Sequence, residues 1–135
     1  LEQGRIDAAW LVEPFLSAAM ASGARPVLWN YAEADPRLII AGYFTSNKLR
    51  QQNPGLVKRF LSATQKSMVY AQSHPNEVRQ ILTTYAKLTA DQTKAVVLPR
   101  YSPTMDQTVL GHIANLVKKY GLTKTTPDVT ALTGQ

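Results

Sequence analysis

The chain has 135 residues, of which 44% are hydrophobic and 18% charged, and it contains no cysteine. This length makes one domain or a large piece of one, and the lack of thiols excludes disulfides, a cysteine nucleophile, zinc ribbons and iron–sulfur clusters. The longest stretches without a charged residue are residues 14–24 and 107–117, each about half of the roughly 20 apolar residues that span a membrane.

The net charge of +6 is distributed unevenly along the chain. Residues 1–36 carry five acidic and two basic residues, whereas residues 37–135 carry four acidic and 13 basic residues. Such asymmetry is typical of some polyanion-binding proteins. The basic residues are spread over several helical patterns, so a solvated surface is the favoured interpretation and a nucleic-acid module is the minor alternative.

The first residues predict the end of a helix. Leu1 to Gln3 would form its last turn, and Gly4 would close it, because glycine is common just past a helix C-terminus. A helix that ends there would have begun earlier, so we expect the chain to be the C-terminal portion of a larger protein.

The next elements predict an α/β fold. Short apolar runs at residues 6–12 and 26–30 are consistent with buried parallel strands, and a helix at residues 14–22 separates them. Strand, helix and strand in this order predict a βαβ unit. A polar connector at residues 30–36 and a third strand at residues 38–44 follow.

From residue 45 onward the pattern predicts helices. Four predicted helices begin at a capping residue or a proline: at Asn53-Pro54, at His74-Pro75, at the Thr89-x-x-Gln92 capping box and at Ser102-Pro103. Apolar side chains recur behind these starts at steps of three and four, which predicts one core-facing side for each helix. Gly121 would end the last long helix, and residues 127–132 would add one turn.

Catalytic patterns are sparse. His74 and His112 are the only histidines and show no metal-ligand spacing, the nine carboxylates are scattered, and no glycine-rich phosphate loop follows a predicted strand. Within these residues we therefore expect no catalytic machinery, no metal site and no cofactor.

One region has the features of a ligand site. Trp10 and Glu13-Pro14 lie where a predicted strand ends and a helix begins, which is where open α/β sheets bind ligands. Trp10 could provide an apolar wall and an indole N–H, although core packing is the favoured interpretation for this residue alone. Glu13 would suit an amine or another N–H donor, and support for the helix dipole is an equal alternative.

Two segments resemble substrate-binding proteins of ABC transporters, in the nitrate/sulfonate/taurine and thiamine-pyrimidine-precursor group. The first resembles the family's "G-x-I-D-A-x-x-x-x-E-P" segment: Gly4-Arg5-Ile6-Asp7-Ala8-Ala9-Trp10-Leu11-Val12-Glu13-Pro14. The second is similar to "N/H-P-x-x-V-x-x-F-L-x-A": Asn53-Pro54-Gly55-Leu56-Val57-Lys58-Arg59-Phe60-Leu61-Ser62-Ala63. With His74-Pro75 and the short helices after it, the likeness covers about the whole chain.

The resemblance implies a fragment of a type II periplasmic-binding-protein fold, a two-lobed α/β architecture. Residues 1–33 would end the second lobe, residues 34–45 would form the return crossover and a strand of the first lobe, and residues 46–135 would form the first lobe's C-terminal helices. Trp10 and Glu13 match cleft-lining positions, and Tyr43 is a weaker ligand-binding candidate.

By the same resemblance, the protein would be a binding protein and not an enzyme. It would bind a small sulfonate, nitrate or related organic solute and deliver it to a membrane permease. It would be periplasmic or extracellular, with a lipid anchor as one option. The alternatives are a thiamine-pyrimidine synthesis enzyme of the same fold and a ligand-binding sensor domain. A homodimer of this portion is also predicted, because a truncated sheet leaves edges to cover.

Overall fold

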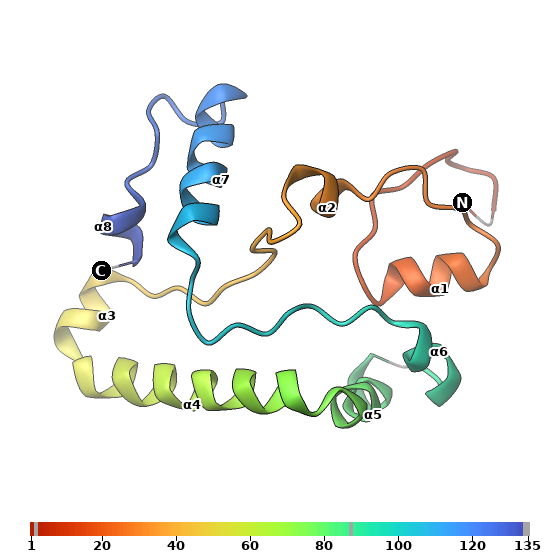
Figure 1. The fold of residues 1–135 in the computed structure, drawn as a ribbon, viewed down its shortest axis with the longest axis horizontal. Helices are drawn as coiled ribbons and strands as arrows, with labels where there is room; N and C mark the ends of the chain where they lie inside the picture. The colour runs from red at the N-terminus through yellow and green to blue at the C-terminus, as the bar shows by residue number, and fades with distance from the viewer. Residues whose placement is uncertain (2, 87, 134–135) are drawn as a thin grey trace. The chain divides into compact units, whose positions relative to one another are not determined.

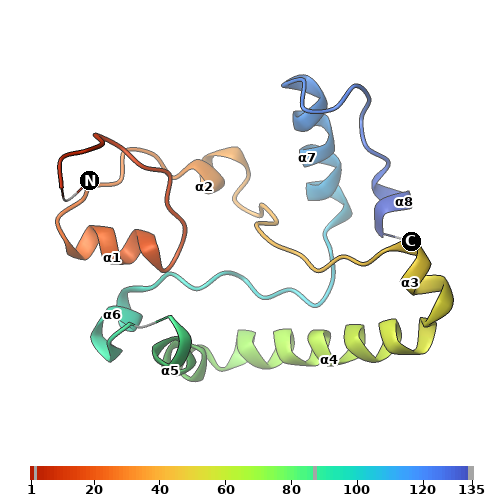
Figure 2. The ribbon, with the colours of Figure 1, turned by 180° about the vertical axis from the view of Figure 1, so that it is seen from behind.

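The computed structural model describes residues 1, 3–86 and 88–133, and every regular element in that part of the chain is a helix (Figure 1). The helices are α1 (Phe15–Ala21), α2 (Asn30–Ala34), α3 (Asn47–Gln52), α4 (Pro54–Ser73), α5 (Pro75–Tyr85), α6 (Ala90–Ala95), α7 (Gln107–Lys119) and α8 (Val129–Thr133). No described helix is both long and apolar enough to cross a membrane. Figure 2 shows the same helices from behind.

The chain divides into two compact units, which are described separately. Unit 1 comprises Leu1–Val27 and Lys58–Pro103, and unit 2 comprises Leu28–Val57 and Thr104–Gln135. The boundary falls inside α4, so the first residues of this helix belong to unit 2 and the remainder to unit 1. The predicted lobe boundaries at residues 33 and 45 stay a prediction.

The predicted α/β fold, with its βαβ unit and crossover strand, is wrong for the described residues, which contain no strand or sheet. The runs at residues 6–12 and 38–44 are irregular, and residues 26–30 lead into α2. A strand forms only when a second segment completes its hydrogen-bond ladder. In the described chain, the backbone hydrogen bonds outside the helices join residues close in sequence. A short apolar run alone does not supply that partner.

The start of the chain contains a turn. The backbone N–H of Gly4 donates to the carbonyl oxygen of Leu1 at 2.9 Å, and Gly4 has a φ of 66°. This backbone conformation favours glycine over residues with a Cβ. The helical turn predicted at residues 1–4 also includes Glu2, which lies outside the described residues.

Unit 1 is built around the packing of α6 against α5 and α1. Its buried side chains are Leu82 of α5, Thr93 of α6 and Val96 just after α6. The predicted capping box is confirmed: the Gln92 N–H donates to the Thr89 hydroxyl at 3.2 Å, and the Thr89 N–H donates to the Gln92 side chain at 2.8 Å. These bonds satisfy N–H groups that a helix start leaves free, so α6 begins where the sequence predicts.

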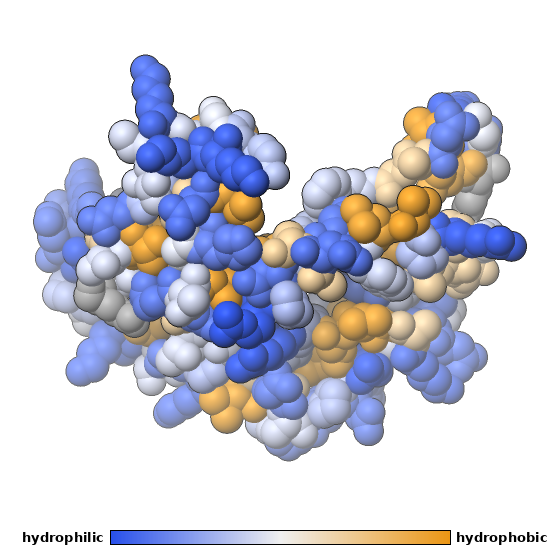
Figure 3. Space-filling view, turned by 45° about the horizontal axis from the view of Figure 1, so that its top comes forward, coloured by the Kyte–Doolittle hydropathy of each residue, from blue (hydrophilic) through white to orange (hydrophobic). Residues whose placement is uncertain are grey.

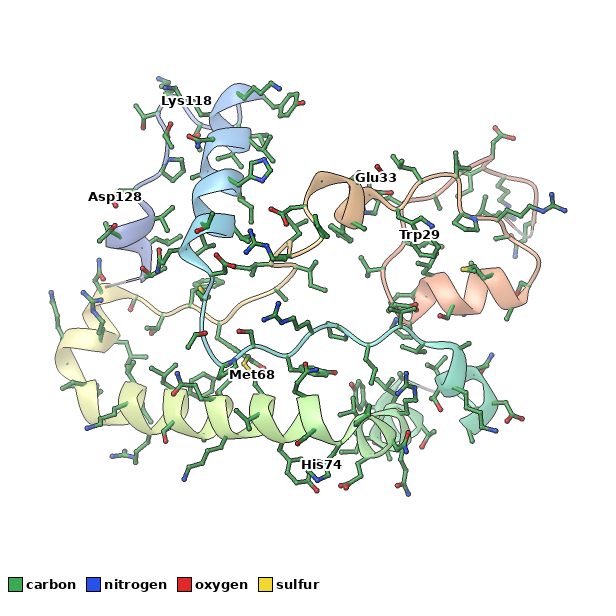
Figure 4. All side chains as sticks on the ribbon, viewed as in Figure 1. Trp29, Glu33, Met68, His74, Lys118 and Asp128 are labelled. Carbon is green, nitrogen blue, oxygen red and sulfur yellow. The ribbon has the colours of Figure 1, made fainter. Side chains whose placement is uncertain are left out.

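Helix α4 begins at Pro54, as predicted, but its apolar stripe is only half covered. Met68 is partly buried, whereas Phe60 and Leu61 remain 53% and 52% exposed. Figure 4 shows Met68 on one side of α4 and His74 on the other. On the face drawn in Figure 3, apolar residues likewise lie at the surface among polar ones. The periodicity of apolar residues thus identifies the apolar side of α4, but it does not determine how much of that side the rest of the protein buries.

The corner between α4 and α5 is held by Tyr70. Its ring stacks on His74 with the centroids 3.8 Å apart, and its hydroxyl donates to Glu77 Oε2 at 2.8 Å. The hydrogen bond to Glu77 raises the pKa of Tyr70 above its ordinary value. His74 precedes the first residue of α5 but makes no side-chain capping bond to it; its Nδ1 lies instead 2.8 Å from the carbonyl oxygen of Tyr70 in α4.

Unit 2 has its core on α7, where Val109 and Ala114 are buried. The predicted start of this helix at Ser102-Pro103 is wrong, because Asp106 provides the cap. Its Oδ1 accepts from the N–H groups of Thr108 and Val109 at 3.0 and 3.2 Å. Figure 4 places Lys118 at the far end of α7 and Asp128 just before α8. Helix α8 packs against α7, close to the turn predicted at residues 127–132.

Asp35 links α2 to α7 within unit 2. Its Oδ1 accepts from the Arg37 N–H at 2.7 Å, and its Oδ2 lies 3.3 Å from His112 Nδ1. These hydrogen bonds, first that of Arg37 and then that of His112, lower the pKa of Asp35 below 3.8. The contact also gives His112 a structural partner.

We expect Asp35 to make the stability of unit 2 sensitive to acid. A carboxyl whose pKa is lower in the folded state stabilises fully above its ordinary pKa and loses this contribution as the pH falls through the lowered value. Urea unfolding of wild type and Asp35→Asn between pH 2 and 6 measures this contribution of Asp35 to the free energy of unfolding. The wild type should be more stable near pH 6, and the difference should vanish in strong acid. A difference independent of pH would contradict this assignment.

Candidate functional site

Glu13 connects the start of α1 to the segment after α6, within unit 1. Its carboxylate accepts from the Ser17 N–H at 3.2 Å, from the Ser17 hydroxyl at 2.8 Å and from the Val97 N–H at 3.1 Å. The Ser17 Oγ also lies 3.2 Å from the carbonyl oxygen of Ala95. The peptide bond between Glu13 and Pro14 is cis. Glu13 therefore positions the beginning of residues 96–101.

Residues 96–101 run beside α4 and α5 and form one side of an open groove in unit 1. The Tyr101 N–H donates to Gln72 Oε1 at 2.8 Å, which holds the segment to α4. The groove has a volume of about 680 Å³, within the range of small-molecule sites. Its lining residues are Ala71, Gln72, Pro75, Arg79, Lys94, Ala95, Val96, Val97, Leu98, Pro99, Arg100 and Tyr101.

The groove is basic. Arg79, Lys94 and Arg100 line it, and none of its lining residues is acidic. Burial raises the pKa of Tyr101 above its ordinary value of 10.0, and Tyr85 acts in the same direction while Arg79 opposes it. The Tyr101 hydroxyl therefore stays protonated at neutral pH and can donate a hydrogen bond. The groove thus combines positive charge with a phenolic donor.

A second, smaller groove lies on the unit 1 part of α4. It has a volume of about 380 Å³ and is lined by Lys58, Arg59, Ser62, Ala63 and Lys66. These residues share one side of the helix, because they recur at steps of three and four. It is formed by one helix alone and is smaller than the groove beside residues 96–101.

The predicted ligand residues fall into both units. Trp10 and Glu13 share the segment before α1 in unit 1, with Trp10 69% exposed, and Tyr43 lies in unit 2, 68% exposed. Their ligand role stays a prediction. Among the described residues, no group of three or more His, Cys, Asp or Glu side chains could hold a metal ion.

Sequence reasoning missed the residues that line the larger groove. Arg79 carries no local signal beyond a position on α5, and Tyr101 resembles an ordinary loop residue. Only Pro99, which marks an extended segment, indicates that this part of the chain is irregular. The groove forms because residues 71–79 and 94–101 come together in the folded chain, and no local pattern encodes that approach.

Comparison with known proteins identifies one family. A family model described as NMT1/THI5 like matches residues 1–78, which is more than half of the chain. The match includes both motif segments and ends within α5, so α6, α7 and α8 lie beyond it. No curated protein and no solved structure matches the chain.

Proposed function

We propose a solute-binding role in an ABC importer for this chain, which belongs to the NMT1/THI5-like family. The family includes substrate-binding proteins of ABC transporters, and it is compatible with a small-molecule ligand. The family match over residues 1–78 is the observation that carries the proposal. The groove in unit 1 adds support, since its volume suits a small organic molecule.

The finer parts of the proposal concern the solute and its destination. The solute would be a small sulfonate, nitrate or related organic compound, and the protein would deliver it to a membrane permease. It would act in the periplasm or outside the cell, free or held by a lipid anchor. A homodimer also stays a prediction, and a monomer mass in equilibrium sedimentation would contradict it.

We propose a binding protein rather than an enzyme. The competing function is thiamine-pyrimidine synthesis, which would need reactive histidine and cysteine side chains, and the sequence has two histidines and no cysteine. His74 stacks on Tyr70, and His112 contacts Asp35. Both rings thus serve structural contacts, which favours the binding role.

A thermal-shift screen of the protein tests the proposed function. The ligands are taurine, other alkanesulfonates, nitrate and pyrimidine precursors. A ligand that binds only the folded state, at a hundred times its dissociation constant, stabilises it by about 2.7 kcal/mol, which raises the melting temperature by several degrees. We expect one class to produce this shift. Turnover of a pyrimidine precursor in a separate activity assay would instead establish the enzyme.

A further inference from the structure

Two arginines in the larger groove of unit 1 have no acidic partner in the described part of the chain. Arg79 is half-buried, and its guanidinium reaches only the carbonyl oxygens of Pro75 and Val96, both at 3.4 Å. Distances this long make weak hydrogen bonds. Arg100 lines the same groove without a hydrogen bond or ion pair to a described residue.

The third basic residue of the groove differs from these two. Lys94 Nζ lies 2.7 Å from Asp91 Oδ1, and this contact raises the pKa of Lys94 and lowers that of Asp91. Asp91 is not among the residues that line the groove. Lys94 therefore has a carboxylate partner, whereas Arg79 and Arg100 are the basic lining residues without one among the described residues.

We propose that Arg79 and Arg100 bind the oxyanion group of a small solute in this groove, and the identity of that solute rests on the proposed function. A guanidinium presents a planar fork of N–H donors that matches sulfonate, phosphate and carboxylate oxygens. The protonated hydroxyl of Tyr101 is a third donor in the lining. No lining residue is acidic, and the Glu13 carboxylate beside the groove already accepts hydrogen bonds from Ser17 and from the N–H of Val97.

Nuclear magnetic resonance titration of the ¹⁵N-labelled chain tests this site. The probes are methanesulfonate, inorganic phosphate and acetate at equal ionic strength, with dimethyl sulfone as the neutral control. We expect saturable shifts for at least one anion at the amides of residues 96–101 and at the Arg79 side chain. The anion with the lowest dissociation constant shows whether the groove prefers a sulfonate, a phosphate or a carboxylate. Equal shifts with dimethyl sulfone, or no saturable shift with any anion, would overturn the proposal.

Matched variants separate the two arginines from the general positive charge. Arg79→Gln and Arg100→Gln should each raise the dissociation constant of the bound anion about tenfold, since each removes a charged donor. Arg50→Gln in α3 removes the same charge outside the groove and should leave binding unchanged. Arg100 is exposed and makes no hydrogen bond or ion pair to a described residue, so Arg100→Gln remains informative if Arg79→Gln fails to fold. An equal effect in Arg50→Gln would overturn the proposal.

The two proposals fail in different ways. Saturable shifts at the groove with phosphate or acetate, while none of the screened solutes stabilises the protein, would leave the groove site standing and contradict the proposed transport of those solutes. A solute that stabilises wild type and both groove variants equally would keep the transport role and overturn the oxyanion site.

Discussion

Replacing Glu13 by alanine is expected to lower the free energy of unfolding by about 1.5 kcal/mol. The carboxylate accepts from the N–H and hydroxyl of Ser17 and from the N–H of Val97, so its loss removes these hydrogen bonds between α1 and the segment after α6. Hydrogen bonds to charged groups contribute about 1.5–3 kcal/mol, and the lower end applies because Val97 is 65% exposed and water can reach its N–H. Urea unfolding followed by circular dichroism measures the change.

Two comparison variants define the role of Glu13. Glu33→Ala removes an exposed carboxylate of α2 and should change the free energy of unfolding by less than about 0.5 kcal/mol. Glu13→Gln keeps an acceptor oxygen and should cost less than Glu13→Ala. If Glu13→Ala is no more destabilising than Glu33→Ala, the carboxylate does not hold unit 1 together. The ligand role predicted for Glu13 would then be favoured, and weaker solute binding by Glu13→Gln would support it.

The parts of the fold that could be predicted are those with local causes. Pro54, Pro75 and the Thr89–Gln92 capping box mark real helix starts, because cap hydrogen bonds and the fixed φ of proline act within one turn. Ser102-Pro103 carries a similar signal but does not start a helix. Asp106, a few residues later, offers a carboxylate that accepts two N–H groups, and the helix begins there.

The predicted strands show where a local pattern stops being informative. Residues 6–12 and 38–44 are apolar enough for buried strands, yet Trp10 and Phe44 are 69% and 98% exposed. Apolar side chains favour burial, but a strand also needs a neighbouring backbone, which no short run encodes.

The same limit applies to the candidate site: only residues that are close in sequence could be predicted to act together. Trp10, Glu13 and Pro14 can be identified from the sequence because they lie within five residues of one another at the predicted start of a helix. The partner of Glu13, Val97, lies far along the chain, and Arg79, Arg100 and the groove they line depend on the same long-range approach. A pattern in sequence therefore locates a carboxylate of interest without revealing that it accepts hydrogen bonds from the protein itself.

Replacing Val109 by alanine is expected to lower the free energy of unfolding by about 2 kcal/mol. Val109 is the one described side chain with 0% exposure, and its helix α7 carries both buried apolar residues of unit 2. The change removes two buried methyl groups, at about 0.8 kcal/mol each, and leaves a cavity that the surrounding side chains fill only in part. Urea unfolding at neutral pH measures the loss.

Val27→Ala is the matched control, because it deletes the same methyl groups from a side chain that is 95% exposed. It should change the free energy of unfolding by less than about 0.5 kcal/mol. A loss in Val109→Ala as small as in this control would contradict a core centred on Val109. The stability of unit 2 would then depend on its polar contacts, chiefly the Asp106 cap with its 3.0 Å ion pair to Arg37. In that case Asp106→Ala should be more destabilising than Val109→Ala.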